Sequence, residues 1–307
     1  MASASAKQNH VDTAELLVDA LEDSYVSDPG ALMTIDVAAA THRGNVRLRN
    51  EDHYLVMRFR RSLENISTNL DCGSAQTNYD LTGYGLLVAD GLGGRVGGEV
   101  ASRTALTKLI ELIIETPDWI MGFEDHDKVE AVLERMTERF FRIDQTLKQQ
   151  ADDDPSLSGM GTTLTAAATV GDDIIIGHIG DSRAYLYRGH VLKQLTRDHT
   201  VAQELIDAGL SGADPAARSM RHVLTAALGV LGTRTKPEVK RIQLRPHDQI
   251  LLCTDGLTAM VDDTTIASAL DTATSASAAC EDLTSLALAA GGRDNVTVVV
   301  ARFGGSI

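Results

Sequence analysis

The segment GYGLLVADGLGG spans residues 83–94 and places an acidic, glycine-rich turn directly after an apolar run that is typical of a buried strand. Three further acidic islands occur at residues 47–52, 254–256 and 293–295, and a fifth follows the same pattern at 180–183. Carboxylates at strand ends, beside glycines that let the backbone approach closely, suit a cluster of hard divalent cations. Together the islands predict metal-assisted phosphate chemistry.

The candidate ligands are all oxygen donors. None of the nine histidines has the HxxxH spacing of a zinc enzyme. The three cysteines, Cys72, Cys253 and Cys280, form no CxxC pair and are expected as buried or spectator thiols. Hard carboxylate sets favour Mg²⁺ or Mn²⁺. A single Asp-Gly pair is more often a simple turn, so this prediction depends on the whole set of islands.

Composition describes a compact soluble chain. It has 307 residues, 43% of them hydrophobic, and only 6 prolines, which suits one large domain or two small ones. The net charge of −15 argues against nucleic acid or an anionic membrane as the main partner, because both require basic patches. No apolar run reaches the ~20 residues of a membrane helix, and residues 1–10 lack the features of a signal peptide. We expect a cytoplasmic protein.

Residues 1–33 are predicted to be an N-terminal appendage. Asp12-Thr13-Ala14-Glu15 is a candidate capping box for a short helix, which Asp28-Pro29-Gly30 would end. A short helix that docks on the main domain or frays in solvent is favoured over a regulatory or partner-binding segment.

From Met33 onward, β and α patterns arrive in blocks rather than in strict alternation, which favours a layered α+β fold over a doubly wound parallel one. Strands are predicted at 35–40, 54–59, 83–89, 163–170, 174–179, 184–187, 239–244, 249–253 and 296–303. Amphipathic helices are predicted around residues 100–113 and 129–147. Only four residues separate the strands at 174–179 and 184–187, which predicts a hairpin and therefore a partly antiparallel sheet. The segment 152–155 is predicted to be a solvated acidic loop.

Eight motifs occur in order along the chain. They are Gly44-x-Val46-Arg47-x-x-Asn50-Glu51-Asp52, Val88-Ala89-Asp90-Gly91-Leu92-Gly93-Gly94, Gly161-Thr162-Thr163, Gly180-Asp181-Ser182-Arg183, Leu195-Thr196-x-Asp198-His199, Ala227-Leu228-Gly229, Thr254-Asp255-Gly256-Leu257 and Arg293-Asp294-Asn295-Val296-Thr297. The set resembles the metal-dependent PPM, or protein phosphatase 2C-like, Ser/Thr phosphatases of the bacterial branch. The resemblance covers roughly residues 34–305.

That resemblance implies a four-layer α/β/β/α sandwich in which two mainly antiparallel sheets are flanked by helices and the metals lie at one end. We expect residues 34–307 to form one catalytic domain with a flap at about 196–229. The resemblance also implies phosphorylated proteins as substrates, two Mn²⁺ or Mg²⁺ ions with a third in many bacterial members, and a Ser/Thr kinase that the enzyme opposes.

The resemblance assigns roles to matching positions. Asp90 would bridge two metals, Gly91 would offer its carbonyl, Glu51 would bind the second metal, and Asp255 and Asp294 would hold the first. Asp52 would bond to metal-bound waters, and Asp181 would help to hold a third ion. A water that bridges the two ions would attack phosphorus in line.

Arg47 is the candidate phosphate clamp, because a guanidinium matches two phosphate oxygens. Its alternative is a surface arginine that pairs with a neighbouring carboxylate. His199 is expected to start the helix Val201–Ala208 and bond locally rather than act at the catalytic mouth. Ser182 and Arg183 are expected to organise the turn around Asp181.

Three positions depart from relatives. Leu92 stands where many eukaryotic members have a histidine proposed to protonate the leaving group, a role that we expect a metal-bound water to take here. Arg218-Ser219 replaces a His-Pro pair that is common in the bacterial flap. Ala259 replaces a secondary acidic position near the third metal.

Two alternative functions stay open. The first is a catalytically silent module that binds phosphoproteins, which the intact carboxylate set disfavours. The second is a phosphatase for an anti-σ-factor antagonist, which the lack of a sensor domain beyond the short appendage disfavours.

Overall fold

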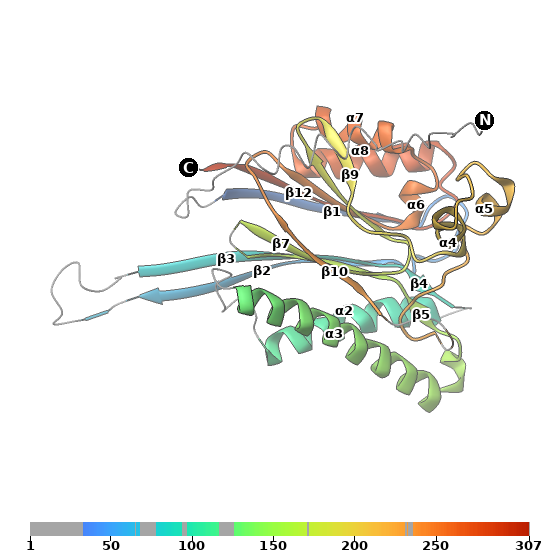
Figure 1. The fold of residues 1–307 in the computed structure, drawn as a ribbon, viewed down its shortest axis with the longest axis horizontal. Coiled ribbons are helices and arrows are strands. Elements are labelled where there is room, and N and C mark those ends of the chain that lie inside the picture. Colours follow the sequence, from blue (N-terminus) through green and yellow to red (C-terminus); the bar gives the residue numbers. More distant parts are fainter. Residues whose placement is uncertain are drawn as a thin grey trace, which may run out of the picture.

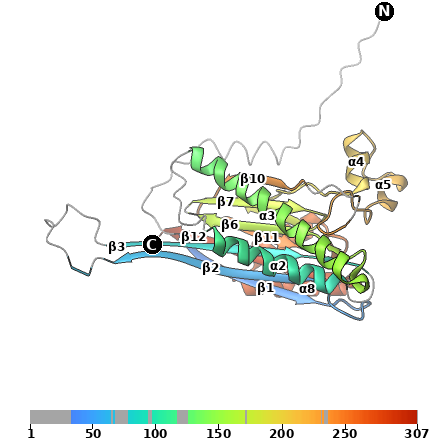
Figure 2. The ribbon, with the colours of Figure 1, turned by 90° about the horizontal axis from the view of Figure 1, so that it is seen from below.

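Two antiparallel sheets pack face to face, and helices cover both outer faces (Figures 1 and 2). The computed structural model describes residues 33–64, 66–67, 78–93, 97–116, 126–170, 172–230, 232 and 236–306. The helix predicted within residues 1–33 and the thiol of Cys72 lie outside these ranges. The four-layer sandwich predicted from the sequence is confirmed.

Each sheet has five strands in antiparallel register. The first sheet has the order β1 (Met33–His42), β12 (Val296–Ser306), β11 (Gln249–Cys253), β8 (Arg183–Arg188) and β9 (Val191–Gln194). The second has the order β10 (Glu238–Gln243), β7 (Asp173–Ile179), β6 (Leu164–Val170), β3 (Asn78–Ala89) and β2 (His53–Glu64). A short ribbon pairs β4 (Gly91–Leu92) with β5 (Gly161–Thr162) beside the second sheet.

The strand β3 explains why residues 83–89 are continuously apolar. Leu86 and Val88 point into the core between the two sheets, whereas Leu87 and Ala89 pack under the helices of the outer layer. A strand that is buried on both faces needs apolar side chains at every position rather than at alternate ones. Each buried leucine or valine contributes about 1.5–3 kcal/mol to folding.

The outer layers are built by helices at the predicted positions. Over the second sheet, α2 (Gly97–Glu115) and α3 (His126–Asp153) bury the predicted apolar faces, including Leu109 and Phe140. Over the first sheet, α7 (Asp263–Thr272) and α8 (Ala276–Ala289) pack on an equivalent cluster that contains Cys253 and Cys280, both buried free thiols. The predicted acidic loop at 152–155 is wrong in part, since Asp152 and Asp153 end α3. Asp154 then caps the 3₁₀ turn Pro155–Leu157.

The hairpin predicted between β7 and β8 is wrong, because these strands belong to different sheets. The four residues between Ile179 and Ala184 carry the chain across the sandwich instead. Gly180 makes the crossing at φ +114°, in a region that favours glycine, and a Cβ there would lie 2.5 Å from the side chain of Thr163. Both sheets are nevertheless antiparallel, as predicted.

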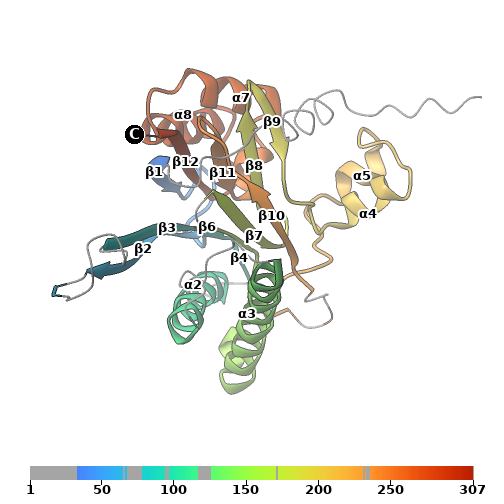
Figure 3. The same ribbon diagram turned by 60° about the vertical axis from the view of Figure 1, so that its left-hand side comes forward.

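Two features extend beyond the sandwich. The β2–β3 pairing continues in register to Glu64 and Asn78, whereas β6 pairs only with residues 85–88 of β3, so the outer half of this ribbon projects from the sheet (Figure 1). The segment 196–229 carries α4 (Val201–Asp207) and α5 (Pro215–Ser219), which lie to one side of the sandwich (Figure 3). We call this segment the flap. None of the described helices is long and apolar enough to cross a membrane.

Candidate metal and phosphate site

The predicted site residues meet at one end of the sandwich. Apart from Asp52, they line one cavity of about 1340 Å³. Its polar lining includes Arg47, Glu51, Asp90, Gly91, Asp181, Asp255 and Asp294. Asp90 follows β3, Asp181 follows β7, Asp255 begins α6 (Asp255–Thr258) after β11, and Asp294 precedes β12. Both sheets therefore contribute carboxylates from the ends of their strands.

The Gly161-Thr162-Thr163 motif fixes the backbone of Asp90. The Asp90 carbonyl accepts hydrogen bonds from the Thr162 hydroxyl at 2.7 Å and from the Thr163 amide at 2.9 Å. The Asp90 amide in turn donates to the Thr163 hydroxyl at 3.0 Å. Three hydrogen bonds from one motif thus fix the main chain at Asp90. The carboxylate of Asp90 therefore projects from a rigid backbone.

Glycines allow close approach of α2 to the site. A Cβ on Gly91 would lie 2.2 Å from the Gly98 carbonyl oxygen, and one on Gly98 would lie 2.7 Å from Oε2 of Glu51. Gly91, Gly98 and the carboxylate of Glu51 are thus packed so closely that neither glycine could carry a Cβ. The placement agrees with the predicted use of the Gly91 carbonyl and the Glu51 carboxylate, which remains a prediction.

Asp52 lies buried behind the cavity and joins the two sheets. It immediately precedes β2 of the second sheet. Its Oδ2 accepts hydrogen bonds from Thr254, which follows β11 of the first sheet, at 2.8 Å and from Thr297 of β12 at 2.7 Å. Its Oδ1 is buried and has no hydrogen-bond partner among the described residues. Burial raises the pKa of Asp52 to about 7, against the two threonine bonds, which lower it.

The other carboxylates are also hard to ionise together. Burial raises the pKa of Asp90 well above its ordinary value, and the charges of Asp52, Asp255 and Asp181 raise it further. Burial is the main cause of the raised pKa of Asp181 and of Asp255 as well. Asp255 also shares a side-chain hydrogen bond with Asp90. A set of oxygen donors that repel one another, with one buried oxygen left unbonded, fits divalent cations, whose charge removes the repulsion.

Arg47 makes an ion pair inside this set. Its Nη2 lies 2.6 Å from Oδ2 of Asp294, and its side chain is 57% exposed. The bond with Asp294 raises the pKa of Arg47. One oxygen of Asp294 is therefore engaged by the arginine. Within the described residues, no group of three His, Cys, Asp or Glu forms a ready metal cage.

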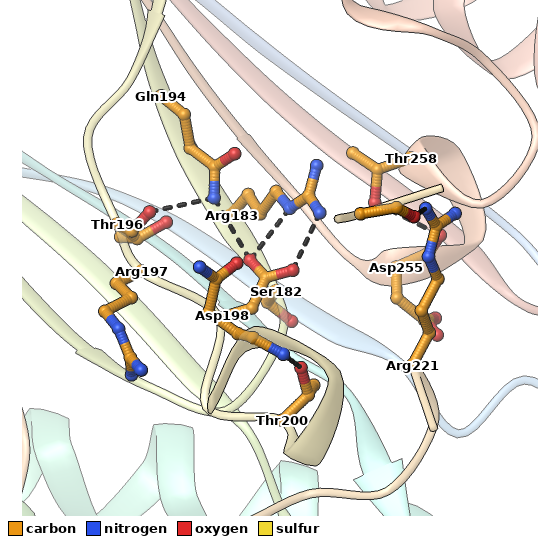
Figure 4. Close-up of polar contacts among 12 residues, drawn as sticks. Ser182, Arg183, Gln194, Thr196, Arg197, Asp198, Thr200, Arg221, Asp255 and Thr258 are labelled. Atoms are coloured by element: carbon orange, nitrogen blue, oxygen red, sulfur yellow. Dashed lines mark hydrogen bonds and ion pairs between the residues drawn. The ribbon is translucent and has the colours of Figure 1, made fainter. Parts of the chain in front are cut away.

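Ser182 and Arg183 make structural contacts around Asp181, as predicted. Arg183 donates from Nε and Nη2 to the two oxygens of Asp198 at 2.8 and 2.7 Å, which ties this turn to the root of the flap (Figure 4). The Ser182 hydroxyl bonds to Thr163 at 2.8 Å, inside the protein. The prediction for His199 is wrong, because its Nδ1 accepts from the Gly180 amide 19 positions away and Thr200 rather than His199 caps α4.

Two supporting residues were missed from the sequence. Asn295 accepts from the Glu51 amide at 2.8 Å and donates to the carbonyls of Arg43 and Arg49, so it anchors the first island against the last. Asp198 is the partner of Arg183. Both lie inside quoted motifs, but no local signal shows which distant groups they contact.

Similarity to known proteins identifies the family. The protein phosphatase 2C family model matches residues 69–289. The chain belongs to this family. It is 31% identical to the serine/threonine phosphatase stp of Listeria monocytogenes, over 85% of this chain and 92% of that protein. It is 38% identical to PstP of Mycobacterium tuberculosis over 70% of this chain, a match that covers 40% of PstP.

Solved structures agree with this family assignment. The catalytic domain of the phosphatase PstP, in complex with two manganese ions, superposes with a TM-score of 0.68 at 33% identity, covering 89% of this chain and all of that one. Stp1 of Staphylococcus aureus superposes with a TM-score of 0.69 at 26% identity, covering 92% and 99% of the two chains. The PPM-type, bacterial-branch resemblance stated from the motifs is confirmed.

Proposed function

We propose that this PPM phosphatase hydrolyses phosphoserine and phosphothreonine in proteins with two Mn²⁺ or Mg²⁺ ions at the cavity of Asp90. The observation that carries the proposal is the meeting of five carboxylates from both sheets at one cavity, backed by the unbonded Oδ1 of Asp52. Glu51, Asp90, Asp255 and Asp294, with the Gly91 carbonyl, would hold the two ions. Asp181 would contribute to a third. When bound, such ions acidify a water molecule and offset the charge on phosphate oxygens.

The chain's own residues prepare the substrate side of the site. Arg47 is exposed at the cavity and has two Nη groups, so it can exchange one carboxylate oxygen of Asp294 for two phosphate oxygens. Asp52 keeps Oδ1 free because its two threonine donors both bond to Oδ2. In this proposal Oδ1 would accept a hydrogen bond from a metal-bound water. Leu92 lines the cavity where a histidine could have donated a proton, so this chain offers no imidazole at that position.

The cellular setting is proposed on the family alone. The enzyme would act in the cytoplasm and oppose a Ser/Thr kinase. The chain's net charge of −15 supports a protein substrate over nucleic acid, because a chain of negative net charge repels a polyanion.

A metal-dependence assay tests the proposal. A phosphothreonine peptide should be hydrolysed with Mn²⁺, and turnover should stop when the ion is chelated and return when it is restored. Asp90→Asn should lower turnover by at least about 100-fold, because it removes the charge of the carboxylate that would bridge both ions.

The matched control is Asp271→Asn. Asp271 accepts from Tyr187 and His190, away from the residues that line the metal cavity, so its replacement should leave turnover near the wild-type value. Equal turnover by the wild type and Asp90→Asn would instead favour the silent phosphoprotein-binding module.

A further inference from the structure

A second groove continues from the metal cavity and passes under the flap. It has a volume of about 880 Å³. It shares Arg47, Asp181, His222, Asp255 and Asp294 with the metal cavity, so the two spaces are continuous. A polypeptide whose phosphate lies at the metal cavity can therefore continue into this groove.

The flap side of the groove carries cations that lack ionic partners. Arg218 lies in the last turn of α5 and Arg221 follows that helix, and both are exposed and line the groove. Across the described ranges no carboxylate pairs with either arginine, and Arg221 donates only to the Gly212 carbonyl, at 3.4 Å. Arg197, also in the flap, differs because it pairs with Asp207.

The opposite side adds further positive charge. Arg293 is exposed there and, like the flap arginines, has no carboxylate partner among the described residues. Asp255 and Thr258 of α6 line the same groove as Arg221, and all three are labelled in Figure 4. His222 is close enough for its charge to lower the pKa of Asp255, against the burial that raises it.

Six aspartates also line the groove. Asp181, Asp255 and Asp294 belong to the proposed metal site, and the other three have hydrogen-bond partners of their own. Asp198 is bonded to Arg183, Asp262 caps α7 through the Thr265 amide, and Asp263 accepts from the Tyr185 hydroxyl. Their charges are thus partly offset where they stand, whereas those of the arginines are open to the groove. In a chain of net charge −15, three arginines that have no carboxylate partner among the described residues and lie beside the reactive site are suited to bind an anion.

We propose that Arg218, Arg221 and Arg293 bind a second anionic side chain of the substrate, a few residues along the chain from the phosphoserine or phosphothreonine that is hydrolysed. This proposal rests on the proposed phosphatase function. With such a subsite, the enzyme would prefer acidic or multiply phosphorylated segments as substrates. A guanidinium recognises carboxylate and phosphate by the same paired hydrogen bonds. An extended peptide advances about 3.3 Å per residue, so a short spacing carries the second group along the groove. The Arg218-Ser219 departure in the flap thereby acquires a role.

Three phosphothreonine peptides test the subsite. One has neutral flanks, one has glutamates two to four residues away, and one has a non-hydrolysable phosphonate in place of those glutamates. For the wild type, kcat/KM should be higher for both anionic peptides than for the neutral one. Each exposed guanidinium contact can contribute up to about fivefold, and the preference should shrink as salt is added.

Variants decide whether the flap arginines are responsible. The double variant Arg218→Ala/Arg221→Ala should bring the ratio of anionic to neutral kcat/KM close to one, whereas Arg218→Lys/Arg221→Lys should keep most of it. Arg58→Ala is the matched control, because Arg58 is an exposed arginine of β2 outside both cavities. Turnover of p-nitrophenyl phosphate gives the active fraction of each preparation.

The outcomes separate the two proposals. A preference for the phosphonate alone would assign the subsite to phosphate, and a preference for both peptides would assign it to anions in general. A wild-type ratio of one, or an unchanged ratio in the alanine variant, would overturn the subsite while the phosphatase function stands. Failure to hydrolyse any phosphopeptide with metal present would overturn both.

Discussion

Arg47 and Asp294 are joined by a 2.6 Å ion pair although 247 positions separate them in the chain. The proposed phosphate clamp therefore holds a proposed metal ligand. An ion that binds Asp294 would release the arginine for the substrate, which would couple metal binding to phosphate binding at one pair of side chains.

Replacing Arg47 by alanine should have opposite effects on the two ligands. Mn²⁺ should bind up to about fivefold more tightly, because Asp294 no longer has to leave an exposed ion pair. The kcat/KM for a phosphopeptide should fall about 10- to 100-fold, because a charged bidentate contact is lost. Calorimetric titration of Mn²⁺ and steady-state kinetics measure the two effects. Weaker Mn²⁺ binding by the variant would contradict the competition.

Mn²⁺ should stabilise the fold through Asp90. At about 100 times its dissociation constant, an ion that binds only the folded state contributes about 2.7 kcal/mol. This should raise the midpoint of thermal unfolding by about 5 °C or more. Asp90→Asn should lose most of the increase, while Asp271→Asn should keep it. An equal increase in wild type and Asp90→Asn would place the ion elsewhere.

Thr297→Val should change the acid–base behaviour of Asp52. The variant removes one of the two hydrogen bonds that lower the pKa of this carboxyl, which already lies at about 7. The pKa should rise further, so the acidic limb of the pH–activity profile should move to higher pH. Stability should fall by about 1–3 kcal/mol because a buried hydrogen bond is broken. The control Thr272→Val removes a hydroxyl that bonds only within its own helix, so it should leave the profile in place.

His178 should make the protein sensitive to acid. This buried ring lies between Thr165 and the Arg197 carbonyl, and burial lowers its pKa to about 4. The unfolded chain binds a proton at an ordinary pKa of about 6.5. The contribution to stability is therefore complete above pH ~6.5 and is lost as the pH falls toward 4, by at most about 1.4 kcal/mol per pH unit.

Urea unfolding at a series of pH values measures this effect. His178→Gln should show a shallower loss of stability than the wild type between pH 6.5 and 4. His222→Gln alters an exposed histidine and should follow the wild-type curve. Parallel curves for His178→Gln and the wild type would show that another group is responsible.

Local patterns sufficed for much of the fold. Asp90 could be placed because the apolar run before it and the glycines after it are adjacent in sequence, and the helices of the outer layers follow from their periodicity. The crossing at Gly180 could not be predicted, because a four-residue connection has the same sequence pattern whether it closes a hairpin or joins two sheets. The choice depends on which strands β7 and β8 pair with, and those partners are distant in the chain.

The site, too, was only partly predictable from the sequence. The motifs predicted which acidic residues would gather, and the cavity contains each of the proposed metal ligands. The contacts among them are set by tertiary packing, as in the pairs Arg47–Asp294 and Arg183–Asp198. The sequence also showed that Arg218-Ser219 replaces the usual His-Pro pair of the flap. Only the structure shows that Arg218 lines a groove beside the metal cavity.

The position of Asp52 has a consequence for how the enzyme matures. Its carboxylate is bonded only when β2 of one sheet has met Thr254 and Thr297 of the other. The proposed ligands are divided between the sheets in the same way. A chain with one sheet formed has only part of the ion's coordination sphere. Metal binding would thus require both sheets to be formed, and partly folded molecules would be inactive.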